Sequence, residues 1–140
     1  MCAHEPGPGR GRILLIDDDR VFGMWVAHVV AKRGGYDFRH TLDPLAGLRC
    51  VETESWDLVI TDMEMPGMTG LELVERVHLR EPGLPVAVMT AHESLPGIIP
   101  AQRSVAAEFL HKPMPAADFL DKVAALIARG QAVRQRRSEE

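Results

Sequence analysis

Residues 56–70 read W-D-L-V-I-T-D-M-E-M-P-G-M-T-G. The continuous apolar run Leu58-Val59-Ile60 predicts a strand over 57–61 that is covered on both faces, as in a parallel sheet. The strand ends on the carboxylate of Asp62, and proline and glycine then break the chain before a helix can begin. Ligands bind at such strand ends in open α/β sheets, although an isolated aspartate here could equally be a turn residue.

Four further apolar segments have the character of strands and alternate with helical patterns. The strands are expected at 12–16, 36–42, 85–89 and 108–111, and helices at about 20–33, 43–54, 71–81 and 116–129. Gly130 is expected to end the last helix, and the prolines at 96 and 100 predict a short or broken helix before the fifth strand. This alternation predicts an α/β fold, a flavodoxin-like doubly wound parallel sheet with the strand order 2-1-3-4-5.

Length and composition indicate one domain, over residues 12–129. The chain has 140 residues and 46% hydrophobic residues, and its formal net charge of -4 gives no sign of a nucleic-acid surface. Residues 1–11 are expected to be a disordered leader and 130–140 a charged tail or linker. There is no apolar run long enough for a membrane span and no signal-peptide pattern. A disulfide between Cys2 and Cys50 is not expected, and together these features favour a cytoplasmic protein.

Five polar side chains follow the predicted strands at the points where those strands end. Asp17 and Asp18 follow the first strand, Asp62 the third, Thr90 the fourth and Lys112 the fifth. Each alone could be a helix cap, a turn residue or a surface charge, but the expected topology brings all of them to one edge of the sheet. Neighbouring carboxylates repel one another unless a cation joins them, and their oxygen atoms suit Mg²⁺. Because Mg²⁺ and lysine both bind phosphoryl oxygens, the pattern indicates phosphoryl transfer to an aspartate.

Four segments together resemble the signature segments of bacterial response-regulator receiver domains, which are CheY-like proteins of two-component systems. They read I-L-L-I-D-D-D, D-L-V-I-T-D-M-E-M-P-G-M-T-G-L-E-L, V-A-V-M-T-A-H and E-F-L-H-K-P-M, and the resemblance covers about residues 12–129. It implies that a sensor histidine kinase or phosphotransfer protein phosphorylates Asp62. It also implies that Asp18, Asp62 and the backbone carbonyl of Glu64 ligate Mg²⁺, while Asp17 acts mostly through water.

The same resemblance assigns the remaining site residues. It implies that Thr90 and Lys112 contact the phosphoryl group, that the Lys112–Pro113 peptide is cis, and that Phe109 occupies the aromatic switch position, although Phe109 could also be plain core. Glu64 and His92 fall at sites that tune the lifetime of the phosphorylated state, and His92 could equally be a solvated loop histidine.

The resemblance also concerns partners. It implies an output domain or target protein of unknown identity, no direct contact with nucleic acid or membrane, and a homodimer that forms on phosphorylation. Two departures affect the surface that commonly signals to partners. Pro96, Gly97 and Pro100 are expected to interrupt the fourth helix, and Val105 stands where a glycine is usual.

Two other interpretations compete with a receiver. Residues 17–21 read D-D-D-R-V and fit the D-x-D-x-[TV] pattern of Mg²⁺-dependent phosphatases of the haloacid-dehalogenase type. In such an enzyme Asp17 would be the nucleophile and Asp19 the acid/base. The chain is short for that family, and Asp19 is better used as a helix cap. A pseudo-receiver that only binds proteins is the third interpretation, but all the expected site residues are present.

Overall fold

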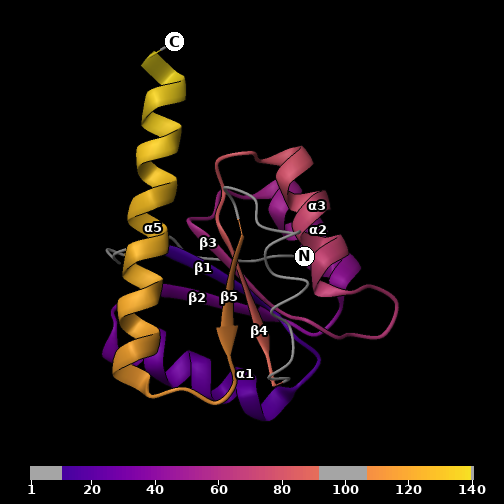
Figure 1. The fold of residues 1–140 in the computed structure, drawn as a ribbon. Coiled ribbons are helices and arrows are strands. Elements are labelled where there is room, and N and C mark those ends of the chain that lie inside the picture. Colours follow the sequence, from indigo (N-terminus) through magenta and orange to yellow (C-terminus); the bar gives the residue numbers. More distant parts are fainter. Residues whose placement is uncertain (1–10, 92–106, 140) are drawn as a thin grey trace.

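The computed structural model describes residues 11–91 and 107–139, and these form a five-stranded parallel sheet with helices on both faces (Figure 1). The strand order is β2-β1-β3-β4-β5, as predicted. The strands are β1 (Arg12–Ile16), β2 (Asp37–Thr41), β3 (Leu58–Asp62), β4 (Val86–Thr90) and β5 (Ala107–His111). Each lies within two residues of its predicted position. The sheet therefore reverses its order between β1 and β3, beside the acidic residues.

Alternate residues of the central strands face two separate cores. Ile13 and Leu15 of β1 pack with α1, η1 and α5, whereas Leu14 and Ile16 pack with α2 and α3. All four of these side chains are fully buried. Covering a strand on both faces removes the need for polar positions, which is why the strands read as continuous apolar runs.

Three helices begin at side chains that accept hydrogen bonds from the first turn. Asp19 caps α1 (Arg20–Val26), Asp43 caps α2 (Pro44–Thr53), and Thr69 caps α3 (Gly70–Arg80). The helix after β1 is present where it was predicted, but its second half is the π-helix η1 (Ala27–Arg33), with a hydrogen bond from Gly34 N to Val29 O. The sequence did not predict this, because the spacing of Val26, Val29 and Val30 at i, i+3 and i+4 is the α-helical pattern and carries no sign of the wider π-helical turn.

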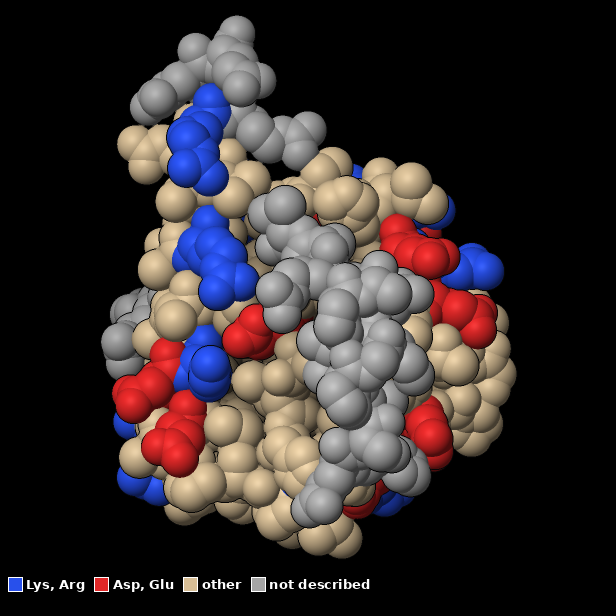
Figure 2. All heavy atoms as spheres, viewed as in Figure 1, with Lys and Arg blue, Asp and Glu red and all other residues tan. Residues whose placement is uncertain are grey.

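The last helix is longer than predicted. α5 runs from Ala116 to Glu139 and rises beyond the sheet, so the expectation that it ends at Gly130 is wrong (Figure 1). Gly130 serves packing instead, because a Cβ at this position would lie 2.6 Å from Pro85 Cδ and 3.2 Å from Gly83 O. Figure 2 shows lysine and arginine side chains along α5, where Lys122, Arg129 and Arg136 recur at seven-residue intervals.

Two further expectations concern cysteine and the fourth helix. Cys50 is buried on α2 and forms a disulfide, so the expectation that these cysteines form no disulfide is wrong. The sequence has one other cysteine, Cys2, which lies outside the described residues. Residues 1–10 of the expected leader, the segment where a fourth helix was expected, Val105 and His92 also lie outside them. None of the described helices has the length and apolar character that would let it span a membrane.

Candidate functional site

Three aspartates meet at the carboxyl ends of β1 and β3. Asp17 and Asp18 directly follow β1, and Asp62 is the last residue of β3. One carboxylate oxygen from each lies within 4.8 Å of the other two. They differ in exposure, because Asp17 is fully buried, Asp62 is partly buried and Asp18 is exposed. The sheet order thus produces the acidic cluster that the sequence predicts.

Asp17 is held in place on several sides. Its backbone N–H donates to Thr41 O at 3.1 Å, which extends the pairing of β1 with β2 by one residue. Its Oδ1 accepts from Asp19 N at 2.9 Å, and its Oδ2 accepts from Lys112 Nζ at 3.0 Å. A buried carboxyl group is tolerated only with such partners, and here they fix the position of the Asp17 side chain within the cluster.

Lys112 brings a positive charge to the cluster from β5. Its backbone N–H donates to Thr90 O at 2.7 Å, and its peptide bond to Pro113 is cis. Its Nζ lies 3.4 Å from Asp62 Oδ1, in addition to its contact with Asp17, and 4.0 Å from the centre of the Phe22 ring. The ammonium therefore sits between two carboxylates and an aromatic face, and it is attracted by all three.

The environment of Asp62 disfavours its negative charge. Burial raises the pKa of Asp62 above its ordinary value, and repulsion from Asp17 raises it further, whereas Lys112 acts in the opposite direction. The lysine therefore compensates only part of the cost of ionising Asp62. A second cation beside Asp62 would offset the part of this cost that Lys112 does not compensate.

The cluster suits Mg²⁺ in its chemistry. The donors are all carboxylate oxygens, which are the ligands that hard divalent cations prefer. Lys112 alone cannot balance the three negative charges of Asp17, Asp18 and Asp62. Asp18 is the exposed member of the cluster.

The other residues that the resemblance assigned lie around this edge. Thr90 ends β4 and is buried, and the backbones of Asp62 and Met89 are paired in the neighbouring strands. Phe109 of β5 is paired with Val88 and packs, partly buried, against the core on the α2 and α3 side. Glu64 is exposed in the loop after β3.

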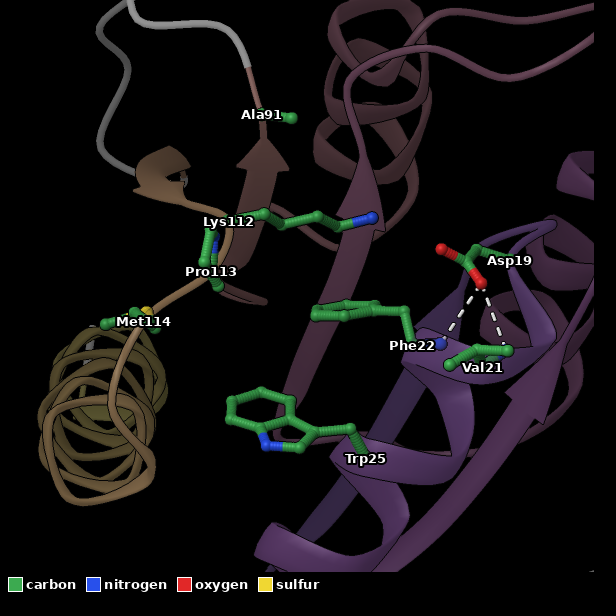
Figure 3. Close-up of a pocket in the computed structure, with 8 residues that line it drawn as sticks. All are labelled: Asp19, Val21, Phe22, Trp25, Ala91, Lys112, Pro113 and Met114. Carbon is green, nitrogen blue, oxygen red and sulfur yellow. Dashed lines mark hydrogen bonds between the residues drawn. The ribbon is translucent and has the colours of Figure 1, made fainter.

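A cavity of about 380 Å³ lies beside the cluster, between the start of α1 and the loop after β5 (Figure 3). Its lining residues are Asp19, Val21, Phe22, Trp25, Ala91, Lys112, Pro113 and Met114. Figure 3 shows the rings of Phe22 and Trp25 on one side of it and Met114 on the other. The spacing of Phe22 and Trp25 on one helix face predicted core residues, yet both are only partly buried. Nothing in the sequence indicated that Phe22 and Trp25 border a cavity and are not part of the core.

Comparison with known proteins gives consistent matches. A family model described as "Response regulator receiver domain" matches residues 13–124. The response regulator protein FleR of Pseudomonas aeruginosa is 36% identical over 113 residues, which cover 81% of this chain and 24% of that protein. The DNA-binding transcriptional regulator NtrC of Escherichia coli is 31% identical over 120 residues, covering 86% of this chain and 24% of NtrC. The chain therefore spans about a quarter of the length of these relatives.

Solved structures share the fold. A response regulator receiver domain protein from Clostridium thermocellum aligns with a TM-score of 0.77 and 29% identity, covering 87% of this chain and 98% of that one. The apo receiver domain of nitrogen regulatory protein C aligns with a TM-score of 0.76 and 27% identity, and the alignment covers 88% of this chain and 98% of that domain. These matches do not support the phosphatase interpretation. In addition, Asp19 Oδ1 accepts hydrogen bonds from Val21 N and Phe22 N and so acts as a helix cap (Figure 3).

Proposed function

Because the chain belongs to the response-regulator receiver domains of two-component systems, we propose that Asp62 accepts a phosphoryl group from a sensor histidine kinase or phosphotransfer protein. The observation that carries this proposal is the position of Asp62. Its carboxylate is partly buried at the end of β3, close to Asp17 and Asp18, and 3.4 Å from Lys112 Nζ. A regulatory domain of this family needs such an acceptor. Asp17, which also contacts Lys112, is fully buried, and its two carboxylate oxygens already accept from Asp19 N and Lys112 Nζ.

The transfer exchanges one bond to phosphorus for another. A carboxylate oxygen of Asp62 forms a P–O bond, and the P–N bond to the donor histidine breaks, leaving the imidazole to pick up a proton from solvent. Little covalent help is needed, so the residues of the site act mainly by position and charge. Lys112 neutralises a phosphoryl oxygen, and the Thr90 hydroxyl donates to another. In this proposal the domain promotes its own phosphorylation and the later hydrolysis of the acyl phosphate.

Mg²⁺ is the cofactor that we propose for this reaction. Asp18 and Asp62 would bind it directly, with the backbone carbonyl of Glu64, and Asp17 would act mostly through water. When bound, the ion neutralises negative charge on the transferred group. Glu64 and His92 flank the phosphoryl group in this proposal and set how long it persists.

The output is a change of packing in β4 and β5. A phosphoryl group adds about 1.5 to 2 negative charges and three acceptor oxygens. If Thr90 moves toward it, space opens behind β4 for Phe109 of the neighbouring strand. Phosphorylation would then shift the population between two packings of this edge and change the surface that a partner reads.

The partners follow from the family and remain proposals for this chain. Since the chain spans about a quarter of FleR and NtrC, an output domain or a separate target protein would receive the signal. We further propose that the domain works in the cytoplasm, that phosphorylation favours a homodimer, and that the domain itself contacts neither nucleic acid nor membrane.

The test is phosphorylation by acetyl phosphate, followed by intact-mass spectrometry with and without Mg²⁺. We expect one added phosphoryl group that requires Mg²⁺ and is absent from Asp62→Asn. Asp19→Asn is a matched control, because asparagine can still cap α1 and the proposal gives Asp19 no chemical role. Undiminished phosphorylation of Asp62→Asn would refute the assignment, and loss in Asp19→Asn alone would revive the phosphatase interpretation.

A further inference from the structure

The edge strand β2 places a histidine against the backbone that carries the acidic cluster. His40 Nε2 lies 2.7 Å from the backbone carbonyl oxygen of Asp17. A carbonyl oxygen only accepts hydrogen bonds, so Nε2 must carry the hydrogen and the imidazole is the donor. Neither the strand-end pattern nor the resemblance assigned a role to His40, because it lies within β2 and not at a strand end.

Gly23 makes room for this histidine. A Cβ at position 23 would lie 2.2 Å from His40 Cε1 and 2.3 Å from Nδ1. Real side chains do not approach so closely, so any residue larger than glycine would displace the imidazole. Glycine in the middle of a helix is otherwise unfavourable. Glycine at position 23 therefore lowers the helix propensity of α1, but it leaves the space that the imidazole needs to reach the Asp17 carbonyl.

The hydrogen bond fixes the peptide group that joins Asp17 to Asp18. Asp17 is pinned on its N–H side by Thr41 O and on its carbonyl side by His40. Among the described residues, no group donates a hydrogen bond to the Asp18 carboxylate, which is exposed. Its direction therefore depends on the backbone that carries it, and that backbone is held by His40.

We propose that His40 is a positioning residue for cation binding: by holding the Asp17 carbonyl, it aims the Asp18 carboxylate at the place where a divalent ion binds. This rests on the proposed function of the acidic cluster. Groups that hold metal ligands in place commonly change metal affinity by an order of magnitude or more. His40 acts through the backbone and does not touch the ion.

The test is Mg²⁺ affinity, measured by titration of the amide NMR signals in the full chain. His40→Gln and His40→Asn form a matched pair, because the glutamine amide can place an N–H near the position of Nε2 and the shorter asparagine cannot. We expect His40→Asn to bind Mg²⁺ about tenfold more weakly and His40→Gln to stay close to the unaltered protein. Gly23→Ala should weaken Mg²⁺ binding as His40→Asn does, although it keeps the histidine and favours the helix.

The outcomes separate this inference from the proposed function. Equal Mg²⁺ affinity in His40→Asn, His40→Gln and the unaltered protein would overturn the role of His40 alone. Equal weakening in both His40 variants, with Gly23→Ala unaffected, would also overturn it, since the donor would then be irrelevant. If the unaltered protein bound Mg²⁺ no better than Asp18→Ala does, the cation site itself would be refuted. Metal-free amide spectra of each variant show whether the fold is intact.

Discussion

Arg134 of α5 is tied to Asp57 at the amino-terminal end of β3, the end opposite Asp62. Arg134 Nη2 lies 3.2 Å from Asp57 Oδ1, and its Nη1 donates to Trp56 O at 3.1 Å. The second oxygen of Asp57 accepts from the backbone N–H of Arg12 at 2.8 Å. The part of α5 beyond Gly130 is therefore bound to the two residues just before β3, and Asp57 in turn binds the first residue of β1.

Arg134→Ala should loosen the end of α5 and leave the rest of the domain intact. The side chains of Arg134 and Asp57 are 36% and 26% exposed, so their ion pair contributes no more than about 1 kcal/mol. We expect faster amide hydrogen exchange over residues 131–136 and little change in the sheet. Arg136→Ala is the control, because Arg136 is an exposed arginine of the same helix. Equal effects of the two substitutions would show that the contact with Asp57 does not hold the helix.

The end of α5 shows where prediction from sequence stops. Glycine after an apolar stripe is a common signal for the end of a helix, and nothing local to Gly130 contradicts it. The contacts that override it come from Pro85 and Gly83, which are distant in sequence. The strand order, in contrast, follows from the alternation of apolar strands and helices, because few topologies satisfy the handedness of the crossovers.

Gly130→Ala should destabilise the protein even though alanine favours helices. The new Cβ would meet Pro85 Cδ at 2.6 Å, and a rigid proline ring cannot move aside without shifting β4. Overpacking of this kind costs about 1–3 kcal/mol, more than the helix propensity that alanine adds. Urea unfolding measures the difference. Gln131→Ala, at an exposed position next along the helix, should be neutral or slightly stabilising. A stabilised Gly130→Ala protein would mean that the helix does not lie against Pro85.

The acidic cluster was predictable for a different reason. Asp17, Asp18 and Asp62 stand at strand ends, and the carboxyl ends of parallel strands meet at one edge whatever the side-chain details. His40 could not be found in this way, since its approach to Asp17 depends on the missing side chain of Gly23. The cavity bordered by Phe22 and Trp25 was likewise hidden, because aromatic residues at helical spacing predict core equally well.

Asp62→Asn should stabilise the metal-free protein at neutral pH. The pKa of Asp62 is raised in the folded state, chiefly by burial, so ionising this carboxyl costs the folded protein free energy. That cost is absent below the unfolded pKa and grows as the pH rises through the folded pKa. Thermal melts in a chelator should therefore coincide at low pH, with the variant increasingly more stable toward neutral pH. Mg²⁺ should raise the melting temperature of the unaltered protein more than that of the variant.

The control for this prediction is Asp121→Asn, which removes an exposed carboxylate on α5. It should change the melting temperature little at any pH. A metal-free Asp62→Asn protein that is less stable than the unaltered one at neutral pH would show that the attraction of Lys112 outweighs burial at Asp62.

Thr90→Ala should leave phosphorylation of Asp62 possible and weaken the change of packing around Phe109 that follows it. Thr90 is buried at the end of β4, and its hydroxyl is the group that the proposed switch pulls toward the phosphoryl oxygens. Moving an equilibrium from mostly off to mostly on takes roughly 5 kcal/mol of differential binding, which needs both the Thr90 hydrogen bond and the Lys112 ion pair. The alanine variant should still bind beryllofluoride at Asp62 but show much smaller amide shifts around Phe109, whereas Thr90→Ser should respond like the unaltered protein because it keeps the hydroxyl. Full shifts around Phe109 in the alanine variant would mean that Lys112 or the backbone carries the signal to β5 without Thr90.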